Sequence, residues 1–158
     1  MNRGVHEPLE EFVFQEMIKH KQKNFKLNQN ETIPGAMLEL GSYWAHYSMW
    51  FAKYFPNSDV YCVESDLLNL ECGKNNFSMN NFKAKFIHAY VCSDDFMVDK
   101  FFVDYNIKHI SVLHSDIQGY ELEMLFNAKN TLINQLIDYI FISTHSQKLH
   151  YDILNILK

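Results

Sequence analysis

The chain has 158 residues, 47% of them hydrophobic, which suits a single domain with a well-filled core. Its formal net charge of −5 and the lack of a basic stripe exclude a nucleic-acid backbone as the main partner. No apolar run resembles a membrane span or a signal peptide, and the three cysteines lack metal-ligand spacing, so we expect a soluble cytoplasmic protein with free thiols and no membrane partner.

The first 34 residues differ in pattern from the rest of the chain. Apolar side chains recur at helical spacing from Glu7 to Lys21, and Pro8 suits the first turn of a helix. The polar stretch from Lys21 to Pro34 predicts a connector. We therefore divide the chain into an N-terminal helix with its connector, residues 1–34, and a single globular unit, residues 35–158.

The segment 36–64 predicts a strand, a tight turn, a helix and a second strand. The apolar run 36–40 precedes a small-residue turn at Gly41-Ser42, and after an aromatic helical stretch the second run ends on Glu64. Ligands bind at the carboxyl ends of strands in a parallel sheet. Glu64 follows Gly41 by about 20 positions, the spacing at which an acid takes ribose hydroxyls. The segment therefore predicts a nucleoside site.

The alternation of strands and helices continues along the rest of the chain. Further strands are predicted at residues 84–91, 110–113 and 137–143, and further helices at 66–79, 96–105, from 119 onward and at 148–157. Each crossover between parallel strands needs a helix. The pattern therefore predicts an α/β fold with a doubly wound, mainly parallel, Rossmann-like sheet of about five strands and helices on both faces.

Four predicted strand ends bring polar residues to one edge of this sheet: Glu39 with Gly41, then Glu64, Asp116 and His145. Glu39 stands in an apolar strand, so it needs a cation or hydrogen-bond donors. A ligand ammonium would supply the first, and a backbone-capping role is the alternative. Glu64 would accept bonds from vicinal hydroxyls or cap the next helix. A metal site needs several convergent ligands, and we expect none.

The first turn lacks the glycine pattern that cradles a pyrophosphate. Tyr43 and Ala45 stand where the later glycines of GxGxxG would be. A nucleoside with a cationic or zwitterionic tail fits this turn better. The turn therefore favours S-adenosylmethionine over a nicotinamide dinucleotide.

With these motifs the sequence resembles the FkbM-type S-adenosylmethionine-dependent methyltransferases, a branch of the class I Rossmann-like methyltransferases. The first family motif is matched by residues 39–48, ELGSYWAHYS, and the second by residues 60–64, VYCVE. The most specific element, Asp-x-Glu-Gly-x-Glu, stands here as residues 116–121, DIQGYE. The match covers roughly Met37 to the C-terminus.

The resemblance implies a role for each matching residue. It places Glu39, Gly41 and Ser42 at the methionine part of the cofactor, Glu64 at the ribose, Val91, Cys92 and Ser93 at the adenine, and Asp116 beside the transferring methyl. Tyr43 and Ser65 complete the implied cofactor-binding set.

Three departures from the family pattern affect the catalytic prediction. Ala45 replaces the last glycine of the turn, Gln118 replaces a glutamate, and His145 ends a strand where many members have a glutamate. Methyl transfer needs an aligned acceptor that gives up a proton, and imidazole accepts protons near neutral pH. We therefore expect Asp116 to position the acceptor and His145 to act as general base or hydrogen-bond partner; the alternative is a helix-capping or surface histidine.

The resemblance implies O-methylation of a hydroxyl on a sugar, a lipid or a small metabolite. The alternative is a non-catalytic module that binds S-adenosylmethionine or a protein partner, because the β-hairpin that closes most class I sheets is missing here. A second copy of the chain would then cover the open sheet edge. A nicotinamide-binding domain is a weaker third possibility, which the missing phosphate glycines disfavour.

Overall fold

The computed structural model describes residues 7–27 and 35–158, which divide into two compact units, Met1–Pro34 and Gly35–Lys158. The described strands are β1 (Ala36–Leu40), β2 (Val60–Glu64), β3 (Lys85–His88), β4 (Ile110–Ser115) and β5 (Ile137–Ile142). The described helices are α1 (Pro8–Leu27), α2 (His46–Tyr54), α3 (Leu67–Met79), α4 (Val98–Asp104), α5 (Glu121–Asn127), α6 (Lys129–Ile133) and α7 (Gln147–Ile156).

The described part of the first unit is the helix α1. It continues to Leu27, so the prediction of a connector beginning at Lys21 is wrong for the residues up to 27. Residues 22–27 contain no proline or glycine, and lysine and glutamine have good helix propensity, so the helix does not end at Lys21. The rest of the predicted connector, residues 28–34, lies outside the described residues.

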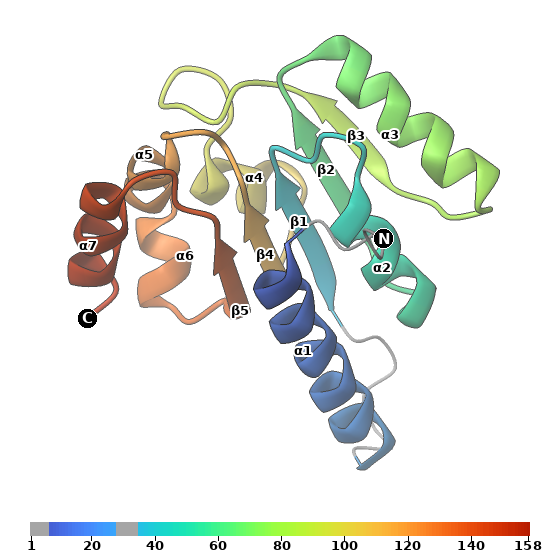
Figure 1. Ribbon diagram of the computed structural model, residues 1–158. Coiled ribbons are helices and arrows are strands. Elements are labelled where there is room, and N and C mark those ends of the chain that lie inside the picture. Colours follow the sequence, from blue (N-terminus) through green and yellow to red (C-terminus); the bar gives the residue numbers. More distant parts are fainter. Residues whose placement is uncertain (1–6, 28–34) are drawn as a thin grey trace. The chain divides into compact units, whose positions relative to one another are not determined.

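The second unit is built on a five-stranded parallel sheet with the order β3-β2-β1-β4-β5. Figure 1 shows β1 in the middle, with β2 and β3 on one side and β4 and β5 on the other. In this register Leu40 pairs with Val63 on one neighbour and with Ser115 on the other, so the carboxyl ends of three strands meet at one edge. The predicted α/β, Rossmann-like fold is confirmed.

The two faces of the sheet carry different layers, since side chains alternate along each strand. One face holds the main apolar core, in which β1, β2 and β4 contribute Leu38, Leu40, Tyr61, Val63 and Leu113, and α4, α5 and α7 contribute Phe101, Met124, Leu125 and Ile153. The opposite face contacts α2 and α3, which follow β1 and β2 in the chain. Helices therefore cover both faces, as a doubly wound sheet requires.

Several helix and strand boundaries in the structure differ from the predicted ones. The strand predicted at residues 84–91 ends at His88, and the helix expected to open at Gly119 begins at Glu121 and is followed by the separate helix α6. The Asp66 side chain caps α3 as expected, since its Oδ1 accepts from the backbone N–H groups of Leu68 and Asn69 at 2.8 and 2.9 Å. Within the described residues, no helix combines the length and apolar character of a membrane span.

Candidate active site

The turn after β1 contacts the ends of both neighbouring strands, β2 and β4. The N–H groups of Gly41 and Ser42 both donate to the carbonyl of Val63, at 2.9 and 3.0 Å. Gly41 has a φ of +70°, and a Cβ added there would lie 2.0 Å from the carbonyl oxygen of Asp116. Both the backbone conformation and this close approach require glycine at position 41.

Glu64 closes the same turn from the end of β2. Its side chain is buried, its Oε2 accepts from the Tyr43 N–H at 2.8 Å, and its Oε1 accepts from the Asp66 N–H at 2.8 Å. A carboxylate offers about four acceptor positions, so two remain for ligand hydroxyls. The residue therefore holds the backbone of both flanking loops and keeps capacity for the predicted ribose contact.

Glu39 lies inside the fold. Its side chain is buried, Oε2 accepts from the Ser48 N–H at 3.1 Å in the first turn of α2, and Oε1 lies 4.0 Å from Nδ1 of His114. Burial raises the pKa of this carboxyl, and the nearby His114 opposes the rise. Glu39 thus has the capping contact foreseen as its alternative role, and its contact with a ligand ammonium stays a prediction.

Two residues without glycine's freedom adopt left-handed backbone in this turn. Tyr43 has a φ of +48° and Ala45 a φ of +64°. The fully buried Ala45 donates its N–H to the Ser42 carbonyl at 2.6 Å and precedes the first residue of α2. The positive φ gives the physical reason why a glycine at position 45 would be favoured.

The predicted adenine residues Val91, Cys92 and Ser93 lie on the loop between β3 and α4. The Cys92 N–H donates to the Phe96 carbonyl at 3.2 Å, and the Ser93 N–H donates to Oε1 of Glu123 in α5 at 2.8 Å. These bonds close the loop on itself and tie it to α5. The loop follows β3, which pairs in parallel with the strand that carries Glu64.

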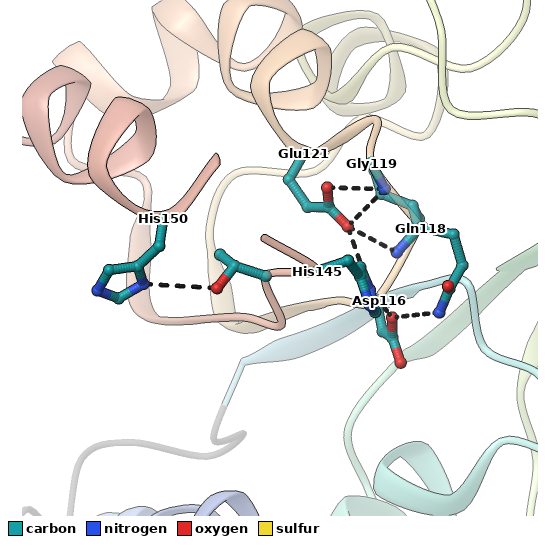
Figure 2. A network of polar contacts seen from close by, with 8 residues as sticks. Asp116, Gln118, Gly119, Glu121, His145 and His150 are labelled. Atoms are coloured by element: carbon teal, nitrogen blue, oxygen red, sulfur yellow. Dashed lines mark hydrogen bonds and ion pairs between the residues drawn. The ribbon is translucent and has the colours of Figure 1, made fainter. Parts of the chain in front are cut away.

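The predicted catalytic pair is brought together, although its members are 29 residues apart in the chain. Nε2 of His145, just after β5, lies 2.7 Å from Oδ1 of Asp116, just after β4. The Gln118 side-chain amide donates to the same Asp116 oxygen at 3.1 Å (Figure 2). Both the aspartate and the histidine are about one-third exposed, so this pair is accessible to solvent.

Glu121, the first residue of α5, is the member of this site that sequence reasoning missed. Its side chain is fully buried, its Oε2 accepts from the Gly119 N–H at 2.9 Å, and its Oε1 accepts from the Ile117 N–H at 3.3 Å. The same Oε1 lies 3.7 Å from Nε2 of His145. Its place as the last acid of the 116–121 pattern was the signal that could have identified it.

Asp116, Glu121 and His145 each offer one ligand atom, and these atoms lie within 4.8 Å of one another. In the part of the chain that the structure describes, this is the group with the spacing for a metal ion. Each atom already has a hydrogen-bond or ion-pair partner within the protein, and imidazole with two carboxylates also suits proton transfer.

The turn and its neighbours fit a nucleoside with a charged tail. Ser42 is 2% exposed, and its Oγ has no hydrogen-bond partner among the described residues. A buried hydroxyl left without a partner is costly, so a polar ligand group beside it would be favourable. With the remaining acceptor positions of Glu64 and the backbone approach at Gly41, this donor set suits S-adenosylmethionine.

Comparison with known proteins agrees with this geometry. The family model described as the methyltransferase FkbM domain matches residues 2–158. A search of curated proteins finds no match.

Solved structures of methyltransferases share the fold at low sequence identity. Precorrin-6y C5,15-methyltransferase from Geobacter metallireducens GS-15 has 10% identity and a TM-score of 0.59, over 99% of this chain and 72% of that chain. A methyltransferase from Pyrococcus furiosus has 14% identity and a TM-score of 0.54, over 99% and 74%. M. capricolum TrmK, in complex with S-adenosyl-homocysteine, has 14% identity and a TM-score of 0.54, over 91% and 57%. The chain thus spans just over half the length of TrmK.

Proposed function

Because the chain belongs to the FkbM methyltransferase domain family, we propose that it methylates a hydroxyl oxygen on a small molecule, a glycan or a lipid. Family and fold together make it an S-adenosylmethionine-dependent methyltransferase with S-adenosylmethionine as its cofactor. The proposal of an oxygen acceptor rests on one observation, the 2.7 Å contact between His145 and Asp116.

When bound, S-adenosylmethionine supplies an electrophilic methyl group on a sulfonium. The chain's own residues then have distinct tasks on the cofactor side. Glu64 offers its remaining acceptor positions to the ribose hydroxyls, and the Ser42 hydroxyl meets a polar group of the methionine part. Gly41 lets the backbone of the turn approach without a side chain in the way.

On the acceptor side, Asp116 orients the imidazole of His145. The carboxylate only accepts hydrogen bonds, so Nε2 carries the hydrogen and Nδ1 keeps the lone pair. Nδ1 is then the atom that takes the proton from the acceptor. A hydroxyl must lose its proton as it attacks, whereas a neutral amine can attack first, so an aligned base favours oxygen acceptors.

A cytoplasmic location is part of the proposal. Cys62, Cys72 and Cys92 are all free thiols in the structure. Free thiols suit a reducing compartment.

The first experiment is a calorimetric titration of the purified chain with S-adenosylhomocysteine, run beside Glu64→Ala. We expect micromolar binding by the wild type and a roughly 10- to 100-fold weaker affinity for the variant, because a charge-assisted hydrogen bond contributes about 1.5–3 kcal/mol. Glu71→Ala is the matched control, since Glu71 is exposed and pairs with Lys74 on the surface of α3.

Two outcomes would contradict the proposal. A folded wild-type chain that binds no S-adenosylhomocysteine would remove its basis, and tighter binding of NAD would point to a dehydrogenase. Melting curves of both variants show whether a lost affinity reflects lost folding. If binding is confirmed, a screen of hydroxyl and amine acceptors with labelled S-adenosylmethionine tests the choice of oxygen.

A further inference from the structure

We propose that Glu121 is a positioning residue whose buried carboxylate stabilises the positive charge that His145 gains when it takes the acceptor's proton. The inference rests on the proposed function, in which His145 is the general base. Both carboxylates lie near the same ring nitrogen (Figure 2): Nε2 of His145 is 3.7 Å from Oε1 of Glu121 and 2.7 Å from Oδ1 of Asp116.

The charge balance around the ring points to this role. Among the described residues, no ion pair joins Glu121 to a lysine or arginine. Its ion-pair partner is His145, and the Asp116 carboxylate lies within 4.8 Å. Asp116 faces the ring from the end of β4 and Glu121 from α5. From α7, His150 contacts the neighbouring Thr144, with 3.4 Å between Nδ1 and Oγ1. Two carboxylates near one ring nitrogen favour its protonated form.

Glu121 also fixes the loop that carries Asp116. Gln118 and Gly119 have φ values of +55° and +106°, two consecutive residues with left-handed backbone. This conformation lets the N–H groups of Ile117 and Gly119 both reach the Glu121 carboxylate. A bent loop of this kind is costly for a non-glycine residue, and these hydrogen bonds offset that cost. One carboxylate therefore holds the aspartate's loop and faces the base.

The reaction step shows where the charge develops. The acceptor O–H bond breaks and its proton passes to Nδ1 of His145, while an O–CH₃ bond forms and the S–CH₃ bond breaks. The sulfonium becomes a neutral thioether, the imidazole becomes an imidazolium, and the ring later returns its proton to water. The positive charge thus moves onto a ring that already lies 3.7 Å from the Glu121 carboxylate, so no group has to move to stabilise it.

The test is an NMR titration of the His145 ring in the wild type and in Glu121→Gln, with His145→Gln used to identify the resonance. A glutamine keeps an oxygen for the Gly119 N–H but carries no charge. We expect the ring to titrate at lower pH in Glu121→Gln, while Glu71→Gln on the surface of α3 leaves the titration unchanged. Coincident titrations in the wild type and a folded Glu121→Gln would overturn the proposal.

Kinetics supply a second readout that separates charge from folding. In Glu121→Gln we expect kcat to fall about 10-fold, KM for S-adenosylmethionine to stay unchanged, and the acidic limb of the pH–rate profile to move to lower pH. A variant with a raised KM and an unshifted profile would contradict the proposal.

A third variant covers the case in which Glu121→Gln does not fold. Glu121→Asp keeps the charge and the acceptor oxygens but moves them one methylene away from the ring, so the ring should titrate at lower pH than in the wild type. A titration that coincides with that of the wild type would overturn the proposal. A wild type that binds cofactor but methylates no hydroxyl would instead contradict the proposed function. The NMR titration would still test the effect of Glu121 on His145 independently.

Discussion

The two halves of the candidate site are held by different kinds of hydrogen-bond donor. On the proposed cofactor side, the Glu64 carboxylate accepts hydrogen bonds from the backbone N–H groups of Tyr43 and Asp66. On the acceptor side, Asp116 receives side chains, the imidazole of His145 and the amide of Gln118. Backbone bonds are fixed by the fold itself, whereas side chains can change rotamer when a ligand arrives. The cofactor half is thus preformed, whereas the side-chain contacts of Asp116 can adapt.

Exposure follows the same division. Glu64 is 7% exposed, while the side chains of Asp116 and His145 are 30% and 36% exposed. The buried hydrogen bonds of Glu64 contribute both to folding and to cofactor binding, so their loss should weaken both. Loss of the exposed Asp116–His145 pair should lower turnover while leaving the fold almost intact. Gly41 belongs to both halves, because it carries the turn of one and touches the backbone of the other.

The largest effect should follow a substitution in the acceptor half. We expect Asp116→Ala to lower kcat by about 10²- to 10⁴-fold, because it removes the group that aligns His145 in the proposed mechanism. Cofactor affinity and melting temperature should change little, since the aspartate is partly exposed and its bonds are to side chains. Single-turnover assays with labelled S-adenosylmethionine measure this split. Near-normal turnover in the variant would show that the pair has no catalytic role.

At the junction of the two halves, Gly41→Ala should destabilise the fold by about 2–4 kcal/mol and abolish measurable cofactor binding. The new Cβ would lie 2.0 Å from the Asp116 carbonyl oxygen, a backbone atom that cannot move aside. Urea unfolding and titration with S-adenosylhomocysteine measure the two effects.

Gly119→Ala is the matched control for that prediction. Its φ is also positive, but an added Cβ would meet no atom within 4 Å. The cost should therefore be only the backbone strain, about 1 kcal/mol. Equal losses at positions 41 and 119 would mean that the close approach to Asp116 does not matter.

The same division explains which parts of the site the sequence could predict. The β1-turn-β2 unit is local, so its strands, its turn and the place of Glu64 follow from apolar runs and spacing along the chain. The pairing of Asp116 with His145 needed only the topology, because parallel strands end at one edge.

What the sequence could not supply depends on tertiary packing. Glu121 is buried because the loop before it folds back on its carboxylate, and no periodicity predicts that bend. The capping contact between Glu39 and Ser48 needs the exact placement of α2 over β1. The end of α1 differs from the prediction for a simpler reason: polarity alone indicates a connector, although these residues favour helix.

A smaller effect should appear in the pH dependence of stability. Burial raises the pKa of Glu39 above its ordinary value of 4.5, so above that pH the unfolded chain has released a proton that the folded chain still holds. Stability therefore falls as pH rises through this window. Because glutamine does not titrate, the free energy of unfolding of Glu39→Gln relative to the wild type should increase between pH 5 and pH 8.

Urea unfolding at the two pH values measures this difference, with Glu71→Gln as the exposed control. The direction is set by burial, the main cause of the raised pKa, because the opposing influence of His114 is smaller. A relative stability that is the same at both pH values would show that Glu39 is already ionised throughout, held by the Ser48 N–H and His114.

We expect the removal of metal ions to have no effect. Chelation with EDTA should leave the methylation rate unchanged, and added Mg²⁺ or Zn²⁺ should not raise the melting temperature. The reason is that Asp116, Glu121 and His145 already satisfy one another and the backbone, although their ligand atoms lie within 4.8 Å. A cation that binds the folded chain would stabilise it in proportion to its concentration. If that stabilisation appeared and Asp116→Asn removed it, the acceptor half would be built around a cation, and His145 could not be the free base.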